Sequence, residues 1–379
     1  MKEYIIVGAG ITGAVIGRHL AERGHKVTIV DRRSHIAGNI YDEKDENGLI
    51  IQKYGPHIFH TNNKRVYDYI TKYADWEDFF LECMVYMKGK YTPSPFNFKT
   101  IDDYYSEEKA KALKARIKAK YGDSEKTTIV EMLNSDDELI KEYADFLFES
   151  DYSLYTAKQW GISPKEIDIS VLKRVPVLFS YKTGYFDDRY QCMPRGGFTK
   201  FIENVLNHEN ITLKLNTEAA SFITIENGTL LINGKETDKT VIYTGAADEL
   251  LNSKYGVLPY RSLKFEYKTE NTDSYQAAPV VAYPEVDGYT RITEYSKLPV
   301  QKTNGKTVIA LEYPLSYDKK TSEPYYPIPT EESRALYEKY RNALDKIPNL
   351  IICGRLGDFK YYNMDGALLR ALEICDTLD

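Results

Sequence analysis

The sequence has few cysteines, no excess of basic residues and no long apolar run, and each shortage excludes a class of protein. Its 379 residues include four cysteines without a CxxC spacing, which argues against a zinc site or a disulfide framework and favours free thiols in a reducing compartment. The net charge of −6 gives no sign of a nucleic-acid-binding face. No run of about 18 apolar residues occurs, and a strand-like segment follows Met1 almost at once. We expect a cytoplasmic protein without nucleic-acid partners or membrane insertion.

The remaining composition is that of an ordinary globular protein, with 42% hydrophobic and 28% charged residues. A chain of this length is expected to form two or three subdomains rather than one core. Its 33 tyrosines are unusual. A tyrosine ring and hydroxyl suit contacts with sugars and nucleobases, although we expect most of these residues to be half-buried packing residues.

The two ends of the chain both have the pattern of an α/β unit. Apolar spacing predicts a strand over residues 3–8, a helix over 12–23 that ends at Gly24, and a second strand over Lys26–Asp31. Near the C-terminus it predicts a strand over Leu350–Cys353 and a helix from about Met364 to Leu378. We therefore predict an α/β fold with a Rossmann-like domain of the glutathione-reductase type, whose sheet is built from both ends of the chain.

The middle of the chain predicts two insertions, a helical lobe and an antiparallel β-sheet domain. Helical patterns such as Ser106–Tyr121 and Asp136–Phe148 dominate the first insertion, which has few strand-like runs. Asn-Gly pairs at 227–228 and 233–234 split short alternating runs (Thr212–Leu215, Leu230–Ile232, Thr240–Thr244) and predict hairpins of an added sheet. Alternation over 260–315 predicts antiparallel strands. The predicted domains are 1–76 with about 195–255 and 345–379 for the cofactor, about 77–165 for the helical lobe, and about 166–194 with 256–344 for the sheet and substrate.

A glycine fingerprint, Gly8-x-Gly10-x-x-Gly13, lies between the first strand and the first helix. Gly8 permits the tight turn, Gly10 lets the backbone approach a pyrophosphate, and Gly13 lets the helix pack close to the strand. Asp31 ends the second strand, where a carboxylate accepts hydrogen bonds from ribose hydroxyls. This context, and not the glycines alone, predicts dinucleotide binding.

The cofactor that the pattern favours is FAD. Asp31 is followed by the small-residue loop that ends in Gly38-Asn39, a pattern of FAD enzymes of the glutathione-reductase type. No second GxGxxG occurs, so we expect an external donor to reduce the flavin. A helix beginning near Met364 can face the N1/O2 edge of the flavin, where its dipole favours the anionic reduced form.

Further segments, together with the fingerprint, resemble the bacterial UDP-galactopyranose mutase family along essentially the whole chain. They are Tyr54-Gly-Pro-His57-Ile-Phe-His60-Thr, Tyr155-Thr-Ala-Lys-Gln-Trp160-Gly, Arg174-Val-Pro-Val, Gly-Tyr185-Phe-Asp-Asp-Arg-Tyr-Gln, Tyr289-Thr-Arg291-Ile, Pro324-Tyr325-Tyr326-Pro327 and Gly354-Arg355-Leu-Gly-Asp-Phe-Lys-Tyr361-Tyr-Asn363-Met-Asp365. The resemblance implies an enzyme, a homodimer, that interconverts pyranose and furanose forms of a nucleotide sugar. It also implies that N5 of reduced FAD attacks the anomeric carbon as a nucleophile, without net redox.

The resemblance assigns roles to residues of this sequence. As catalytic residues it implies Arg174 and Arg291, which would hold the departing diphosphate, and His60. The implied cofactor-binding residues are Gly8, Gly10, Thr12, Gly13, Asp31, Arg32, Asn39, His57, Ile58, Arg355 and Met364. The implied substrate-binding residues are Tyr155, Thr156, Trp160, Tyr185, Tyr326 and Tyr361. No metal site is expected, because His57 and His60 have no carboxylate partner at a metal-binding spacing.

Two positions depart from the family pattern and leave the substrate open. The family has a sugar-contacting Asn near the position where this sequence has Leu81. It has an Asp where this sequence has Asn363. Leu cannot donate to a hydroxyl, so a 6-deoxy sugar, as used by the related dTDP-fucopyranose mutases, is an alternative to UDP-galactose. UDP-N-acetylgalactosamine is another. Two different functions also remain as alternatives, an oxidoreductase such as a flavin amine oxidase and a non-catalytic binding protein.

Overall fold

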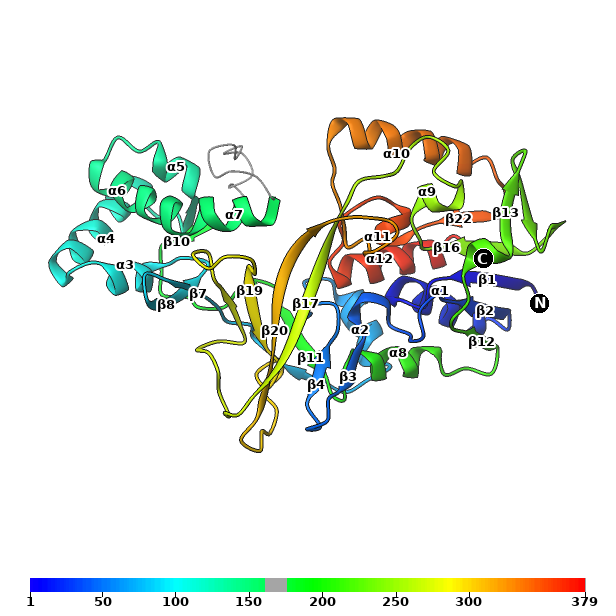
Figure 1. Ribbon diagram of the computed structural model, residues 1–379, viewed down its shortest axis with the longest axis horizontal. Coiled ribbons are helices and arrows are strands. Elements are labelled where there is room, and N and C mark those ends of the chain that lie inside the picture. Colours follow the sequence, from blue (N-terminus) through cyan, green and yellow to red (C-terminus); the bar gives the residue numbers. More distant parts are fainter. Residues whose placement is uncertain (161–175, 379) are drawn as a thin grey trace.

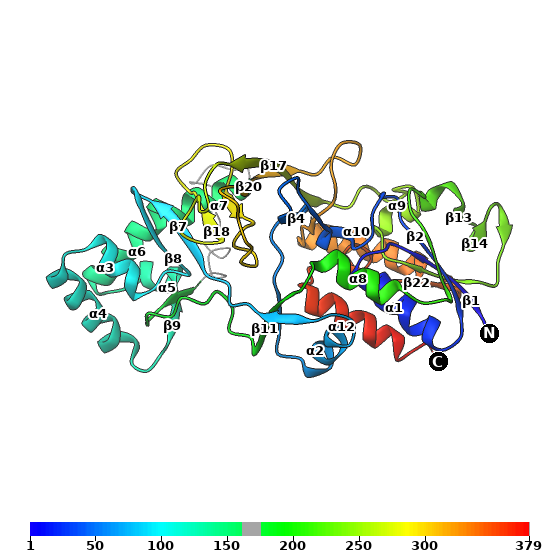
Figure 2. The ribbon, with the colours of Figure 1, turned by 90° about the horizontal axis from the view of Figure 1, so that it is seen from below.

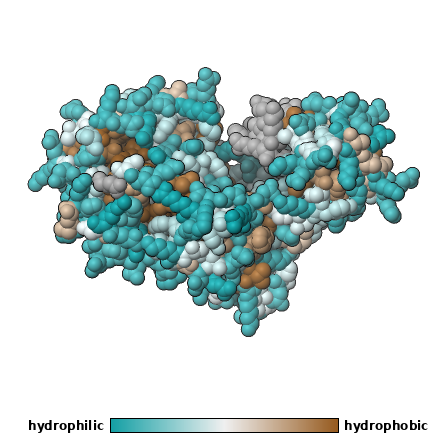
Figure 3. Space-filling view, turned by 180° about the vertical axis from the view of Figure 1, so that it is seen from behind, coloured by the Kyte–Doolittle hydropathy of each residue, from teal (hydrophilic) through white to brown (hydrophobic). Residues whose placement is uncertain are grey.

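The computed structural model describes residues 1–160 and 176–378. Figure 1 shows a larger part that holds both termini and is built around a parallel sheet, and a helical lobe at the opposite end. The long strands β17 (Tyr260–Glu270) and β20 (Thr307–Ser316) lie between them. In the space-filling view the surface is notched between the two parts (Figure 3). The predicted α/β class with a Rossmann-like domain and an antiparallel sheet is confirmed.

Within the described ranges, five parallel strands form the sheet of the larger part, in the order β12-β2-β1-β16-β22. They are β1 (Glu3–Val7), β2 (Lys26–Val30), β12 (Ile211–Lys214), β16 (Thr240–Tyr243) and β22 (Leu350–Ile352). Strands from both ends of the chain meet here, as predicted. The expectation that the runs at 212–215 and 240–244 belong to an added sheet is wrong, because β12 pairs with β2 and β16 pairs with β1.

Helices cover one face of this sheet and a mixed layer covers the other. Figure 2 shows α1 (Ile11–Glu22), α8 (Phe198–Leu206) and α12 (Met364–Cys375) packed together on the first face. The second face carries α9 (Ala247–Leu250), α10 (Glu331–Leu344) and the hairpins of β13 (Ile223–Glu226), β14 (Thr229–Ile232) and β15 (Lys235–Glu236). Those hairpins turn at Asn227-Gly228 and Asn233-Gly234 with positive φ, as the Asn-Gly pairs predict.

An antiparallel sheet, into which one parallel pair is inserted, joins the two parts of the molecule. In the described chain its order is β21-β17-β20-β19-β18-β7-β8. Its shorter members are β7 (Cys83–Met87), β8 (Lys90–Ser94), β18 (Val280–Ala282), β19 (Arg291–Glu294) and β21 (Tyr326–Pro327). β7 and β8 come from the segment expected to be mainly helical, and β7 runs parallel to β18. The helical insertion is therefore attached to the sheet through its own first hairpin.

The helical lobe has its own apolar core. Its elements are α3 (Phe98–Tyr104), α4 (Glu107–Tyr121), β9 (Lys126–Thr128), α5 (Ile129–Leu133), α6 (Glu138–Leu147), the π-helical turn η2 (Phe148–Tyr152), α7 (Ser153–Trp160) and β10 (Pro176–Leu178). Ser106 caps α4 and Gly122, with φ of +59°, ends it, so local signals set both ends of this helix. The helices predicted over Ser106–Tyr121 and Asp136–Phe148 are thereby confirmed as α4 and α6.

Small elements complete the described part of the chain. They are η1 (Gly38–Ile40), β3 (Asp42–Lys44), β4 (Ile50–Gln52), β5 (Phe59–Thr61), α2 (Lys64–Thr71), β6 (Trp76–Asp78), β11 (Tyr190–Pro194), η5 (Ala219–Ser221) and α11 (Gly354–Gly357). β11 lies between β5 and β6 and fixes the segment that carries His60.

Candidate active site

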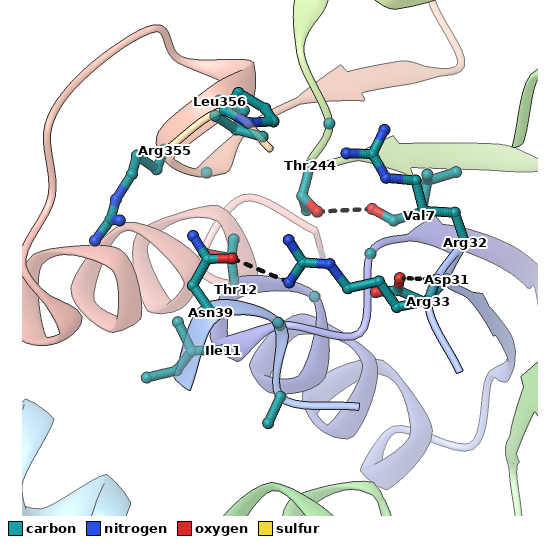
Figure 4. A pocket seen from close by; sticks show the side chains of 18 of the residues that line it. Val7, Ile11, Thr12, Asp31, Arg32, Arg33, Asn39, Thr244, Arg355 and Leu356 are labelled. Carbon is teal, nitrogen blue, oxygen red and sulfur yellow. Dashed lines mark hydrogen bonds between the residues drawn. The ribbon is translucent and has the colours of Figure 1, made fainter. Parts of the chain in front are cut away.

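The turn between β1 and α1 forms one wall of a first cavity (Figure 4). Gly8 has φ of +106°, and a Cβ there would lie 2.0 Å from Thr244 Oγ1. A Cβ on Gly13 would lie 2.0 Å from the carbonyl oxygen of Gly8, so α1 packs directly on the turn. Gly10 is the N-cap and has no side chain to cover the first N–H groups of α1. These groups and the positive end of the helix dipole form an anion site.

Asp31 lies beside the glycine turn, at the end of β2, and lines the same cavity. Its carboxylate accepts hydrogen bonds from the backbone N–H of Ala9 at 2.8 Å and of Arg33 at 2.9 Å. One acceptor bond on each oxygen leaves further lone pairs free. The carboxylate is therefore fixed in place and can still accept from two hydroxyls of a ribose.

Two arginines border the first cavity next to Asp31. Glu323 Oε2 lies 2.8 Å from Arg32 Nη2 and 2.9 Å from Arg33 Nη2. Arg33 also donates to Asn39 Oδ1 at 3.0 Å, a bond drawn in Figure 4. The carboxylate of Glu323 thus neutralises much of the positive charge beside the nucleotide cradle and orders both guanidinium groups.

A second cavity, of about 360 Å³, lies beside the first, within the size range of small-molecule sites. The two cavities share His57, Arg355 and Met364 in their walls. The second cavity is enclosed by residues of η2 and α7, of strands β7, β18, β19 and β21, and of the N-terminal end of α12. A ligand in the first cavity can therefore contact a ligand in the second at these three residues.

His57 and Arg355 form the junction between the cavities. Burial and the charge of Arg355 lower the pKa of His57 to about 4, so its imidazole is neutral near pH 7. Its Nδ1 lies 2.8 Å from the carbonyl oxygen of Gly55, and a neutral ring donates from that nitrogen. Arg355 donates to the carbonyl oxygen of Tyr362 at 2.7 Å. Its guanidinium therefore supplies the positive charge at the junction.

His60 lines the second cavity and is held on two sides. Its Nδ1 lies 2.7 Å from Asp188 Oδ2. Its ring is stacked on Phe186 with a centroid separation of 3.7 Å. Ile58, on the same segment, also lines the second cavity.

Arg291 enters the second cavity from β19. Its Nε and Nη2 donate to Glu312 Oε2 at 2.8 and 2.7 Å. The register of β19 and β20 pairs these two residues directly across the strands. Burial and the charge of Arg291 both act on the pKa of Tyr155 and of Tyr326, burial raising it and the charge opposing the rise. Arg291 therefore lies near both tyrosines, and its remaining N–H groups can meet an anion.

The structure brings most of the predicted site residues to these two cavities. The first is lined by Gly8, Gly10, Thr12, Gly13, Asp31, Arg32, Asn39, His57, Arg355 and Met364. The second is lined by Ile58, His60, Tyr155, Thr156, Tyr185, Arg291, Tyr326 and Tyr361. Arg174 lies outside the described residues. Trp160 is the last residue of α7, and only its backbone is described.

The tyrosines differ in how they face the second cavity. Tyr326 and Tyr361 lie with ring centroids 5.6 Å apart, and the guanidinium of Arg355 lies over both rings at 5.4 and 5.6 Å. Tyr185 and Tyr361 are more than a third exposed. Arg355 therefore orders the rings of Tyr326 and Tyr361 near the junction, and the rings of Tyr185 and Tyr361 are open to a ligand.

The two positions that depart from the family pattern also line the second cavity. Leu81 is 4% exposed and offers only an apolar surface. Asn363 is the N-cap of α12. Both substitutions therefore concern the surface that a substrate would meet.

Two carboxylates of the site were missed by sequence reasoning. Glu312 orients Arg291. The alternating run over 260–315 carries both residues and predicts strands, but it does not show that these two residues pair across neighbouring strands. Asp151 lines the second cavity and is 9% exposed. Its position just before the Tyr155 segment was the only hint of its place.

The described residues contain neither a metal-binding cluster nor a helix able to span a membrane. Residues 1–160 and 176–378 contain no group of three or more His, Cys, Asp or Glu side chains arranged to hold a metal ion. No helix in these ranges combines the length and apolarity needed to cross a membrane. The four cysteines are buried and unpaired.

Comparison with known proteins places these cavities in context. A family model described as UDP-galactopyranose mutase matches residues 151–361, and one described as an NAD(P)-binding Rossmann-like domain matches residues 6–73. The chain is 36% identical to the "Probable UDP-galactopyranose mutase" of Klebsiella pneumoniae, with 99% of this chain and 94% of the relative covered. It is 35% identical to the dTDP-fucopyranose mutase of Escherichia coli, with 98% and 97% covered.

A solved structure has the same fold. The crystal structure of a reduced UDP-galactopyranose mutase superposes with a TM-score of 0.71 at 18% identity and covers 100% of this chain and 94% of that one. At that identity the similarity concerns the fold alone. The family model described as UDP-galactopyranose mutase covers the part of the second cavity wall that runs from Asp151 to Tyr361, and the Rossmann-like model covers the glycine turn.

Proposed function

Because this chain belongs to the UDP-galactopyranose mutase family, we propose that it interconverts the pyranose and furanose forms of a nucleotide sugar, with UDP-galactose as the leading substrate. The observation that carries this proposal is the junction of the two cavities at His57, Arg355 and Met364. A cofactor cradled by the glycine turn would meet there a sugar bound beside Arg291. The enzyme is accordingly an isomerase.

The cofactor that we propose for the first cavity is FAD. The uncapped N-terminus of α1 and the carboxylate of Asp31 fit the pyrophosphate and ribose of a dinucleotide. The N-terminal end of α12, at Met364, lines both cavities, and its dipole favours a negative charge such as that of a reduced flavin. Reduced FAD would supply a nucleophilic nitrogen and leave the oxidation state of the sugar unchanged.

The residues of the second cavity have tasks that follow from their chemistry. Arg291, oriented by Glu312, would hold the diphosphate as its charge grows on leaving. The matching task of Arg174 rests on the family resemblance. Arg355 would keep positive charge beside the cofactor while His57 stays neutral.

A second candidate substrate is dTDP-fucose, which the apolar surface of Leu81 favours because a 6-deoxy sugar has no hydroxyl at that carbon. Reduced enzyme should be offered UDP-galactose, UDP-N-acetylgalactosamine and dTDP-fucose in parallel, with furanose products separated by chromatography. We expect the highest kcat/KM with UDP-galactose. A preference for dTDP-fucose would identify the alternative substrate and retain the mutase reaction.

The reaction type is tested by the redox state of the cofactor. We expect turnover with dithionite-reduced enzyme and at most a trace with oxidised enzyme. Equal turnover of both forms would contradict the proposal. An external reductant and a homodimer in the cytoplasm complete the proposal, and the dimer is tested by light scattering of the purified protein.

A further inference from the structure

Asp151 differs from the other buried carboxylates of the protein. Those of the described residues are Asp31, Asp42, Asp151, Asp248, Glu294 and Glu312. Five of them accept hydrogen bonds from protein groups, for example Asp42 from the backbone N–H of Phe198 at 2.6 Å. Within residues 1–160 and 176–378, no hydrogen bond or ion pair is formed to the carboxyl of Asp151. A buried carboxyl without a partner is costly, and this one lies in the wall of the second cavity.

Lys158, whose charge acts on the carboxyl of Asp151, does not serve as that partner. The ammonium of Lys158 donates to the carbonyl oxygens of Tyr283, Val286 and Tyr289 at 2.5, 2.7 and 3.0 Å. An ammonium has three donors, so these bonds use all of them. Lys158 thereby ties α7 to the loop between β18 and β19, and the carboxyl of Asp151 stays available to a ligand.

The order of residues along the cavity shows which part of a ligand Asp151 would meet. Tyr326 lies on β21 beneath the guanidinium of Arg355 at the junction, and Arg291 lies further across the same sheet on β19. The turn η2, which carries Asp151, packs on β7, two strands beyond β19. Asp151 therefore lies beyond Arg291 as seen from the junction. If the sugar lies at the junction and the diphosphate at Arg291, the nucleoside lies toward Asp151. This step rests on the proposed function.

We propose that Asp151 is a specificity-determining residue that accepts a hydrogen bond from the nucleoside half of the substrate. In its ionised form, above its pKa, the carboxyl accepts and cannot donate, so it then selects a ligand with a donor at that place. A uracil-type nucleoside offers three such donors, the imide N3–H of the base and the 2′- and 3′-hydroxyls of the ribose. Any one of them would give the carboxyl of Asp151 the partner that the described protein groups do not supply.

The test is ligand binding to the FAD-loaded, oxidised protein at a pH above the pKa of Asp151, measured by isothermal titration calorimetry with UDP, 2′-deoxy-UDP, 3′-deoxy-UDP and N3-methyl-UDP. We expect wild type to bind one of the three analogues roughly tenfold or more weakly than UDP, since a hydrogen bond to a charged group contributes on that order. Weaker binding of the methylated analogue identifies the base as the donor, and weaker binding of a deoxy analogue identifies that ribose hydroxyl. Equal binding of all four ligands by wild type would overturn the proposal.

The variants decide whether Asp151 is the acceptor. Asp151→Ala should bind UDP about tenfold more weakly than wild type and should no longer distinguish the sensitive analogue. Asp151→Asn, which keeps one accepting oxygen, should recover part of the loss. Asp151→Ala with the affinity and discrimination of wild type would overturn the proposal.

Asp287→Ala is the matched control. Asp287 is exposed and does not line the cavity, yet both it and Asp151 raise the pKa of Lys158 against the effect of burial. If Asp151 acted only through Lys158 and α7, both alanine variants would weaken UDP binding alike. We expect Asp287→Ala to bind all four ligands as wild type does. Failure of wild type to bind UDP at all would instead contradict UDP-galactose as the leading substrate of the proposed function. Circular dichroism and flavin content check that each variant is folded.

Discussion

Arg291 illustrates how a single side chain of this site is prepared for its task. Glu312 takes the Nε and Nη2 side of the guanidinium, so the side chain is oriented before a ligand arrives. We predict that Arg291→Ala lowers kcat about 100- to 1000-fold, the effect of removing one preorganised donor of roughly 2.7–4 kcal/mol. Steady-state turnover of the reduced enzyme measures this. The same loss is expected for Arg174→Ala.

Arg189→Ala is the control for the loss of a positive charge alone. Arg189 is exposed and lies over the ring of Tyr190, away from the walls of the second cavity. Its variant should turn over as wild type does. Wild-type turnover by Arg291→Ala would show that Arg291 does not hold the diphosphate.

Asp151 also predicts a pH dependence of stability. Burial raises the pKa of its carboxyl to about 7, against the opposing charge of Lys158, whereas an unfolded Asp titrates near about 3.9. Between these values the folded protein binds a proton that the unfolded chain does not, so stability falls as pH rises from about 4 to about 7 and then levels off. The melting temperature of wild type should decrease over this range relative to that of Asp151→Asn.

The titratable groups around Asp151 do not change their charge between pH 4 and 7. Tyr152 and Tyr155 have pKa values raised by burial, and burial lowers the pKa of Lys158 to about 8. None of these three titrates between pH 4 and 7 in the folded protein. A constant difference in melting temperature between wild type and Asp151→Asn across the range would show that the carboxyl titrates normally.

At the scale of elements, the turn between β1 and α1 can be tested against a turn of similar backbone strain. Gly8 and Gly24 both have positive φ, +106° and +80°, but a Cβ on Gly24 would meet nothing within 4 Å. Gly8→Ala would collide with Thr244, so we predict loss of bound FAD. Gly24→Ala should keep full FAD content and lose about 1–2 kcal/mol of stability. Flavin absorbance per protein measures the first effect and urea unfolding the second.

How far sequence predicts elements depends on how local their causes are. The unit of β1, α1 and β2 was predicted almost to its ends, because its spacing and its glycines act within a few residues. The same holds for α4, with its cap at Ser106. β12 and β16 were assigned to the wrong sheet, because alternation marks a strand without naming its partner. For the same reason β7 and β8 were not expected in the antiparallel sheet.

The site shows the same limit more strongly. The fingerprint predicted Gly8, Gly10, Gly13 and Asp31 from local chemistry alone. Arg291 and Tyr326 were predicted only through resemblance, because nothing in their own segments distinguishes them from other surface residues. Asp151 was missed, because burial without a partner is a property of the folded chain and not of the sequence around it.

At the scale of the whole molecule, the first cavity joins distant parts of the chain. Its walls come from residues 7–57, 217–249 and 323–367. A cofactor bound there contacts segments that are far apart in the sequence and come together only in the folded chain, so its binding energy adds to the stability of the folded state. The cofactor is therefore expected to stabilise the larger part of the molecule as one unit.

Removal and return of the cofactor then test its identity. We predict that the flavin-free protein melts at a lower temperature than the holoenzyme. Added FAD should restore the melting temperature of the holoenzyme. At a ligand concentration of 100 times Kd the gain is about 2.7 kcal/mol. NAD shares the ADP half of FAD and should bind the glycine turn, but it has no isoalloxazine to fill the junction at His57 and Met364, so it should restore less. If NAD raised the melting temperature as much as FAD does, the first cavity would recognise only the dinucleotide. There would then be no reason to place a flavin beside the second cavity.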